Sequence, residues 1–171
     1  MLLENFSEKY RTAVSDYYAE FSENGEDVRE DVCGGPSLTF LYIRENDGRL
    51  VGMLNIRKGE EAERIGTFGY AIRPSERRKG YGSMLVESAL ELCEMMEIED
   101  PVLYVNKDNV AGLRLLESLG FCETGNTDKT GANDNVIKCY KPSSSGRRWP
   151  EDCHKVAAKQ TEPCDSKTDE G

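Results

Sequence analysis

The feature that most constrains the fold is a junction between a strand and a helix near the middle of the chain. The stretch RIGTFGYAIRP (residues 64–74) reads as a strand that Pro74 ends, because proline has no backbone N–H and disfavours helix at the preceding residue. A helix is expected to begin near Gly80, since apolar residues then recur at helical spacing. These residues are Tyr81, Leu85, Ala89, Cys93 and Met96. The loop SERRKGYGS therefore leads from a strand into the first turn of a helix buried on one side.

That loop has the composition of an anion-binding site. The first amides of a helix have no acceptor within the helix, and the helix dipole makes its start positive. Gly80 and Gly82 remove the Cβ atoms that would hold a phosphate away from the backbone. Arg77, Arg78 and Lys79 add positive charge around it. The alternative is a solvated helix start in which both glycines are only turn residues.

The other periodic segments predict further strands and helices. Apolar runs at 37–44 and 49–57 predict a hairpin, because Asp47 and Gly48 between them form a strong turn signal. A helix is expected over 2–23, where apolar residues recur at intervals of three and four. Downstream we expect a strand over 101–106 and then a helix over 108–120, with Asp108 or Asn109 as its N-cap and Gly120 as its end. Two closing antiparallel strands are expected at 121–125 and 134–141.

Length and composition predict one domain followed by a tail. A chain of 171 residues is the size of a single domain. We expect the folded domain at 1–141 and a flexible polar tail at 142–171, where Ser, Pro, Gly and charged residues show no sustained period. Trp149 is the one tail residue that could dock on the domain.

Charge and cysteine usage exclude several classes of protein. A net charge of −10 argues against a nucleic-acid partner. The chain shows neither a signal peptide nor an apolar run long enough to cross a membrane, so we expect a soluble, cytoplasmic protein with no membrane partner. The six cysteines are irregularly spaced and are expected to be free thiols. Cys153, His154 and Cys164 are too few ligands for a structural zinc site, and no metal is expected.

Two motifs in this order resemble the GNAT superfamily of N-acetyltransferases. RRKGYG (77–82) resembles the family's pyrophosphate loop, R/Q-x-x-G-x-G/A, which follows a long strand and opens a long helix. VLYVNKDNVAGLRLLESLGF (102–121) resembles its second conserved region, a strand, an Asn-capped helix and a closing SLGF. The resemblance covers roughly residues 37–141. It implies an α/β (α+β) fold in which helices flank a central mixed, mostly antiparallel sheet.

The resemblance also implies an acetyl-coenzyme A site. The pyrophosphate would lie on the amides from Arg77 to Ser83, the pantetheine arm would pair with the backbone of Tyr70 to Ile72, and Asn109 would hydrogen-bond the arm. The implied cofactor-binding residues are Tyr70, Ala71, Ile72, Arg77, Arg78, Lys79, Gly80, Tyr81, Gly82, Ser83 and Asn109. The alternative is that Tyr70, Ala71 and Ile72 have only a structural role in the strand and that Asn109 is only a helix cap.

Two departures from the family leave the catalytic residues unknown. Many members carry a tyrosine acid where this chain has Leu116, and often a glutamate base where it has Tyr104. An amide of Ala71 or Ile72 is the expected oxyanion donor. Candidate substitutes for the acid and base are the phenols of Tyr81, Tyr104 and Tyr140, or a water relay to Glu60, Glu61, Glu63 or Glu123.

Removing a proton from the amine requires more catalytic help than protonating the leaving thiol. A lysine-like amine with a pKa of about 10.4 is neutral about once in 2,500 molecules at pH 7, a deficit of about 4.6 kcal/mol. A thiol with a pKa of about 8.5 needs only about 2 kcal/mol of proton help to leave.

The expected activity is direct transfer of the acetyl group of acetyl-coenzyme A to a primary amine of a small molecule or peptide, through a ternary complex. An acidic chain suits a cationic acceptor, and the resemblance allows a homodimer. Two alternatives stay open. One is a non-catalytic module that binds or senses acyl-coenzyme A, and the other is a small anion- or nucleotide-binding protein.

Overall fold

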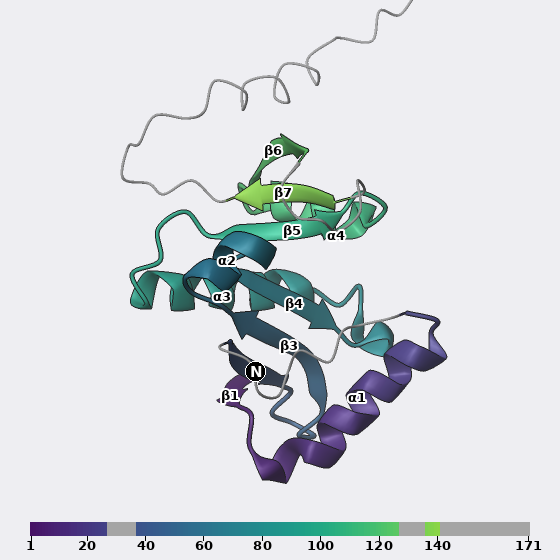
Figure 1. The fold of residues 1–171 in the computed structure, drawn as a ribbon. Coiled ribbons are helices and arrows are strands. Elements are labelled where there is room, and N and C mark those ends of the chain that lie inside the picture. The colour runs from purple at the N-terminus through teal and green to yellow at the C-terminus, as the bar shows by residue number, and fades with distance from the viewer. Residues whose placement is uncertain (27–36, 127–135, 141–171) are drawn as a thin grey trace, which may run out of the picture.

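Seven strands and four α-helices make up the described part of the chain (Figure 1), which in this computed structural model covers residues 1–26, 37–126 and 136–140. In chain order the elements are β1 (Leu2–Asn5), the 3-10 helix η1 (Glu8–Tyr10), α1 (Arg11–Glu23), β2 (Leu38–Ile43), β3 (Leu50–Ile56), α2 (Glu60–Ile65), β4 (Phe68–Ile72), the 3-10 helix η2 (Pro74–Glu76), α3 (Tyr81–Met95), β5 (Val102–Asn106), α4 (Val110–Ser118), β6 (Cys122–Asn126) and β7 (Val136–Tyr140).

The strands form two antiparallel sheets that meet at β4 and β5. One sheet has the order β1-β2-β3-β4 and the other the order β5-β7-β6. At the junction, the Thr67 amide donates to the Val102 carbonyl at 2.7 Å, and the Val102 amide donates to Thr67 Oγ1 at 3.0 Å. Gly66 permits this approach, since a Cβ there would lie 2.9 Å from the Val102 carbonyl oxygen. The two sheets are thus joined where β4 and β5 begin.

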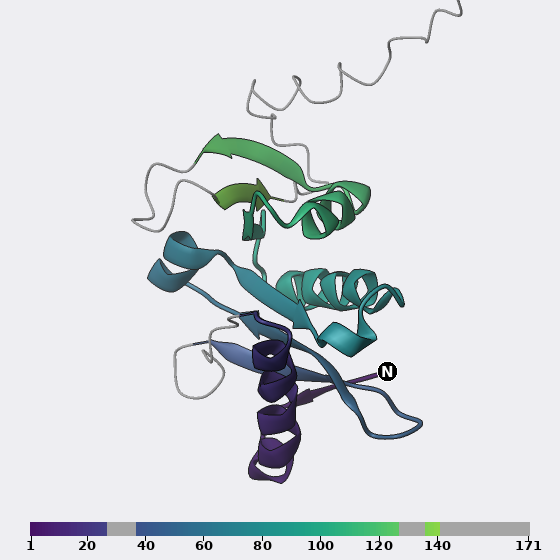
Figure 2. The same ribbon diagram turned by 90° about the vertical axis from the view of Figure 1, so that its right-hand side faces the viewer.

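Helices cover both faces of the larger sheet (Figure 2). On one face Tyr17 and Phe21 of α1 pack with Leu41 and Met53 in one apolar cluster. On the other face α3 and α4 pack on a second cluster that includes Leu54. Because both faces are covered, β3 is apolar along nearly its whole length, unlike a strand with one face in water.

The predicted architecture is confirmed, with helices flanking a mostly antiparallel sheet. The hairpin forms as expected, with Gly48 at a φ of 68° in its turn. The helix of the central junction begins at Tyr81, directly after Gly80. The strand at 102–106, the helix that Asn109 caps and the two closing strands are also present.

Two predicted segments are wrong at their starts. The helix expected over 2–23 begins only at Arg11, because residues 2–5 form β1 and pair with β2, a long-range contact that local periodicity cannot report. The strand expected over 64–74 begins at Phe68, because Glu60–Ile65 forms α2. The predicted tail at 142–171 lies outside the described residues, as do Cys153, His154 and Cys164. Among the described helices, none is long and apolar enough to span a bilayer.

Candidate active site

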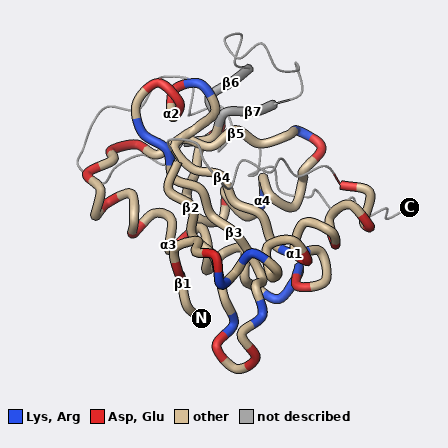
Figure 3. The backbone as a smooth tube through the Cα atoms, turned by 60° about the horizontal axis from the view of Figure 1, so that its bottom comes forward, with Lys and Arg blue, Asp and Glu red and all other residues tan. Residues whose placement is uncertain are grey.

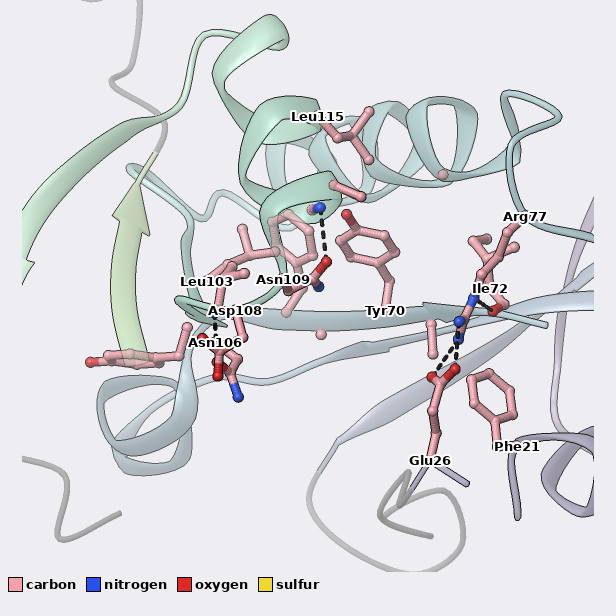
Figure 4. A pocket seen from close by; sticks show the side chains of 18 of the residues that line it. Phe21, Glu26, Tyr70, Ile72, Arg77, Leu103, Asn106, Asp108, Asn109 and Leu115 are labelled. Carbon is pink, nitrogen blue, oxygen red and sulfur yellow. Dashed lines mark hydrogen bonds and ion pairs between the residues drawn. The ribbon is translucent and has the colours of Figure 1, made fainter. Parts of the chain in front are cut away.

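A cavity of about 790 Å³ opens where β4 and β5 part (Figure 4). The walls come from β4 and β5, from the first turns of α3 and α4, and from the end of α1. Since the two strands are linked by a crossover helix and are tied at their first residues, the cavity lies toward their carboxyl ends. Ligands of α/β proteins commonly bind at such a position.

The edge of β4 that faces the cavity carries backbone groups that pair with no neighbouring strand. The Arg73 amide donates to the Val51 carbonyl of β3 at 2.9 Å. Because hydrogen-bonded positions alternate along an antiparallel ladder, Ala71 and Gly69 also turn their amides toward β3. Tyr70 and Ile72 then present their amides and carbonyls to the open edge. Of the two amides expected to serve an oxyanion, only that of Ile72 is on this edge.

The first turn of α3 presents further donors. Gly80 is the N-cap, and among the described residues no side chain caps the helix. The Met84 amide donates to the Gly80 carbonyl at 3.3 Å, so the amides of Tyr81, Gly82 and Ser83 precede the first intrahelical bond. Gly82 of this turn lines the cavity, whereas Gly80, Tyr81 and Ser83 do not. An anion at the turn would meet free N–H groups and the positive end of a helix.

Glycine is required at positions 80 and 82 for different structural reasons. Gly80 has a φ of 84°, a left-handed angle that residues with a Cβ resist. Gly82 packs α3 closely against α4, since a Cβ there would lie 3.2 Å from Leu115 Cδ2. The sequence predicts that both glycines let a phosphate approach the backbone. The structure adds a conformational role for Gly80 and a packing role for Gly82.

The structure distinguishes the three cations that the sequence treats alike. The Arg77 guanidinium donates two hydrogen bonds of 2.6 Å to Glu26 and one of 3.1 Å to the Ile72 carbonyl, and it lies over the Phe21 ring (Figure 4). Lys79 Nζ lies 2.9 Å from Glu76 Oε2. Arg78 is exposed, has a φ of 63° and forms no ion pair with another described residue. Arg78 is therefore the cation left to meet a bound anion.

Glu76 organises the loop before α3. Its carboxylate is buried and accepts bonds from Arg44 at 2.8 Å and Lys79 at 2.9 Å, with Arg49 Nε at 3.1 Å. Burial opposes ionisation of Glu76, but the Lys79 hydrogen bond and the Arg44 charge outweigh it and lower the pKa. Charges of both signs interleave at the neighbouring hairpin (Figure 3).

A second carboxylate, Glu20 of α1, fixes the end of β4. It accepts a hydrogen bond from Arg73 Nε and another from the Ser75 amide, both at 2.6 Å. Burial opposes its ionisation, and the bonds from Ser75 and Arg73 lower its pKa nonetheless. The basic cluster of this acidic chain is thus largely neutralised by glutamates. Sequence reasoning missed Glu20 and Glu76, because Glu20 lies 53 positions from Arg73 and Glu76 lies 32 positions from Arg44.

Asn109 does cap a helix. Its Oδ1 accepts a hydrogen bond from the Gly112 amide at 2.9 Å. A Cβ at Gly112 would lie 2.7 Å from Asn109 Nδ2, so the close turn depends on glycine. Asn109 also lines the cavity, where the amide group keeps donors for a ligand.

The candidate acid and base residues are placed as follows. Leu116 is buried in the core, and the Tyr104 hydroxyl donates to the Glu63 carbonyl at 3.3 Å. Tyr81 packs half-buried against the core and does not line the cavity. None of the four candidate glutamates lines it either. The Tyr140 side chain lies outside the described part of the chain.

Tyr70, expected only as a backbone contact, places its side chain in the cavity. Figure 4 shows the phenol directed toward the first turn of α4, with its ring between Asn109 and Ile72. Burial raises the pKa of Tyr70 to about 12.

Comparison with known proteins decides the family. Residues 5–121 match the Acetyltransferase (GNAT) family. The chain belongs to the GNAT family of acetyltransferases. The match includes the α3 loop and Asn109, so the cavity of this GNAT chain lies within the matched region.

Individual relatives agree with the family but differ in acceptor. The chain is 34% identical over 82 residues to the mycothiol acetyltransferase of Streptomyces coelicolor, a match that spans 47% of this chain and about a quarter (26%) of that protein. A ribosomal-protein-alanine N-acetyltransferase from Brucella melitensis has a similar fold, with a TM-score of 0.62 and 17% identity over 84% of this chain and all (100%) of the other.

A spermidine N-acetyltransferase chimera from Vibrio cholerae and hSSAT gives a TM-score of 0.63 and 18% identity over 82% of this chain and 95% of the other. At these identities the structures establish the fold alone. The chain thus belongs to a family of acetyltransferases, and its acceptor is a separate question.

Proposed function

We propose that this chain transfers the acetyl group of acetyl-coenzyme A to a primary amine of a small molecule or peptide, by direct attack in a ternary complex. One observation carries the proposal: the open edge of β4 and the uncapped start of α3 border the same cavity. An extended arm ending in a diphosphate matches that pair of features, because strand edges pair with amides and helix starts bind phosphate.

The residues of the chain divide the binding between them. The backbone amides from Arg77 to Ser83 would hold the diphosphate. The Arg78 side chain would add positive charge. Tyr70 and Ile72 would pair with the amides of the pantetheine arm, while Ala71 stays paired with β3. The Asn109 side chain would donate to the arm from the start of α4. Bound acetyl-coenzyme A would supply the thioester that an amine attacks.

The reacting centre needs an oxyanion donor and a neutral amine. The Tyr70 amide also faces the open edge and lies further from the α3 loop than Ile72, so it would stabilise negative charge on the thioester oxygen while Ile72 pairs with the arm. The amine must lose its proton before it attacks, and no carboxylate among the four candidates lies at the cavity wall. Glu26 does lie there, and its carboxylate is the group that a cationic acceptor would meet once Arg77 moves aside.

The acceptor class is proposed from charge only. The named relatives are a mycothiol, a spermidine and a ribosomal-protein-alanine acetyltransferase, so the family does not select one acceptor. A cationic amine suits the net charge of −10. The homodimer and the cytoplasmic location likewise stay predictions.

The test begins with binding. Acetyl-coenzyme A should raise the melting temperature, whereas ATP should not. A panel of amines then follows with detection of free thiol. Thiol release with at least one amine supports the transferase, binding without release would indicate an acyl-coenzyme A sensor, and a response to ATP alone would contradict the proposal.

A matched pair of variants tests the loop. Ser83→Pro removes one amide hydrogen of the first turn, where proline is tolerated, and Ser83→Ala keeps it. We expect the proline variant to bind acetyl-coenzyme A roughly ten-fold more weakly than the alanine variant, the loss of about one charge-assisted hydrogen bond. Equal affinities would place the diphosphate elsewhere. A bulky residue at Gly82 is a poorer probe, because it would also push Leu115 away.

A further inference from the structure

The acetyl transfer proposed above leaves one proton transfer without a donor. When the carbon–sulfur bond breaks, the electron pair stays on sulfur, and a proton there lowers the energy of departure. Leu116, at the expected acid position, is an apolar side chain with 1% of its surface exposed. The donor must therefore come from another residue at the cavity.

Among the described residues that line the cavity, only two carry a neutral hydroxyl. Tyr104 already donates its hydroxyl hydrogen to the Glu63 carbonyl. Tyr70 forms no hydrogen bond with another described residue, and its half-buried side chain lines the cavity. A phenol that lies at the cavity wall and lacks a partner among the described residues is ready to donate to a ligand.

The position of Tyr70 fits a sulfur atom rather than a phosphate. Its side chain shares a face of β4 with Phe68 and Ile72, the face that α3 and α4 cover. A cofactor arm that enters at the start of α3 passes the end of β4 first and reaches Tyr70 two residues further in, about 7 Å along the strand. Figure 4 shows the hydroxyl pointing away from the Ile72 end, into the space below the first turn of α4.

We propose that Tyr70 is the general acid that protonates the leaving coenzyme A sulfur. The amine nitrogen bonds to the thioester carbon, the carbon–sulfur bond breaks, and its electron pair goes to sulfur. The Tyr70 hydroxyl gives its proton to that sulfur. The phenolate then recovers a proton from the positively charged nitrogen of the product, directly or through water. The balance is one amine hydrogen exchanged for one thiol hydrogen, and no further reactant is required.

The protonation state of Tyr70 agrees with this role. Burial keeps the pKa of the phenol at about 12, so the hydroxyl is protonated at neutral pH. It therefore begins each cycle as an acid, and the same shift makes it a poor base for the incoming amine.

A titration of bound coenzyme A tests the contact without any turnover. The thiolate of saturating coenzyme A is followed by its ultraviolet absorbance as pH rises, in the wild-type chain and in Tyr70→Phe. A hydrogen bond to the thiolate should lower the pKa of the bound thiol by about one unit in the wild type relative to the variant. Tyr42→Phe, which removes a hydroxyl outside the cavity, is the matched control and should titrate like the wild type.

Kinetics give the second readout. Tyr70→Phe should lower kcat by about ten- to thirty-fold, the most that a thiol with a pKa of about 8.5 gains from a proton near pH 7. The dissociation constant of acetyl-coenzyme A should stay within about two-fold, and the solvent isotope effect on kcat should fall.

The possible failures are distinct. An unchanged thiol pKa together with an unchanged kcat would overturn the role of Tyr70, while transfer by the wild type would leave the proposed function standing. Loss of acetyl-coenzyme A binding in Tyr70→Phe would make Tyr70 a binding residue and also overturn it. A wild-type chain that binds no coenzyme A would overturn the proposed function, and this inference with it.

Discussion

The Tyr17 hydroxyl donates a hydrogen bond to the Ala71 carbonyl oxygen at 2.8 Å, and so ties α1 to the strand that borders the cavity. Tyr17 is fully buried, and burial raises the pKa of its phenol. The register turns Ala71 toward β3, so the bond holds β4 from the face opposite α3. The open edge of β4 is thereby kept in place without using the backbone groups that face the cavity.

Tyr17→Phe should lower the free energy of unfolding by about 1 kcal/mol, the usual net value of one hydrogen bond. The Ala71 carbonyl keeps its ladder partner in β3, so no acceptor is orphaned. The melting temperature should fall by about 3 °C for a chain of this size. A loss above about 3 kcal/mol in denaturant titration would show that the carbonyl depends on Tyr17 alone.

Glu76→Gln should destabilise the chain by about 2 kcal/mol. The substitution leaves Arg44, Arg49 and Lys79 around a neutral amide, and partial exposure of these cations keeps the cost below the 3–5 kcal/mol typical of a fully buried pair. The control is Glu8→Gln, which breaks an exposed pair with Arg11 and should leave the unfolding midpoint unchanged. Equal effects of the two variants would contradict the bracing role of Glu76.

Stability should fall on acidification. The pKa values of Glu20, Glu26 and Glu76 lie below the ordinary value of 4.5, so the folded chain favours their ionised forms. For such groups the stabilisation is complete above the unfolded pKa and disappears as pH falls through the folded pKa. The contribution of these three glutamates to the free energy of unfolding should therefore stay constant from about pH 6 to pH 5. It should decline below about pH 4.5. A rise in stability below pH 4.5 would contradict these ion pairs.

Arg78→Gly should separate backbone strain from charge. The left-handed φ of 63° favours glycine, so stability should stay level or rise by up to about 1 kcal/mol. Acetyl-coenzyme A should bind about five- to ten-fold more weakly, with a shallower salt dependence, because the unpaired cation is gone. Arg78→Lys retains the charge and should bind within about three-fold of the wild type. Unchanged affinity in Arg78→Gly would remove Arg78 from the site.

Much of the fold was predictable because its signals are local. The Asp47–Gly48 turn, the Pro74 strand end and the Asn109 cap each depend on residues within a few positions of one another. These same signals located the α3 loop, and hence the cavity wall.

The remaining features depend on contacts between distant segments. β1 is a strand because β2 offers it an edge, and Glu26 holds Arg77 across 51 positions of sequence. The direction of the Tyr70 phenol likewise follows from the sheet, since alternation along β4 and the packing of α4 decide it. Alternation along β4 groups Tyr70 with Phe68 and Ile72, but only the packing of distant segments decides that α3 and α4 cover this face.

Residue-resolved amide hydrogen exchange with and without coenzyme A tests the central claim most directly. If the pantetheine arm pairs with the open edge of β4, exchange at Tyr70 and Ile72 should slow by at least about ten-fold, together with exchange in the first turn of α3. Gly69 and Ala71, already turned toward β3, should change only as much as other core amides. Unchanged exchange at Tyr70 and Ile72 under saturating coenzyme A would contradict the account.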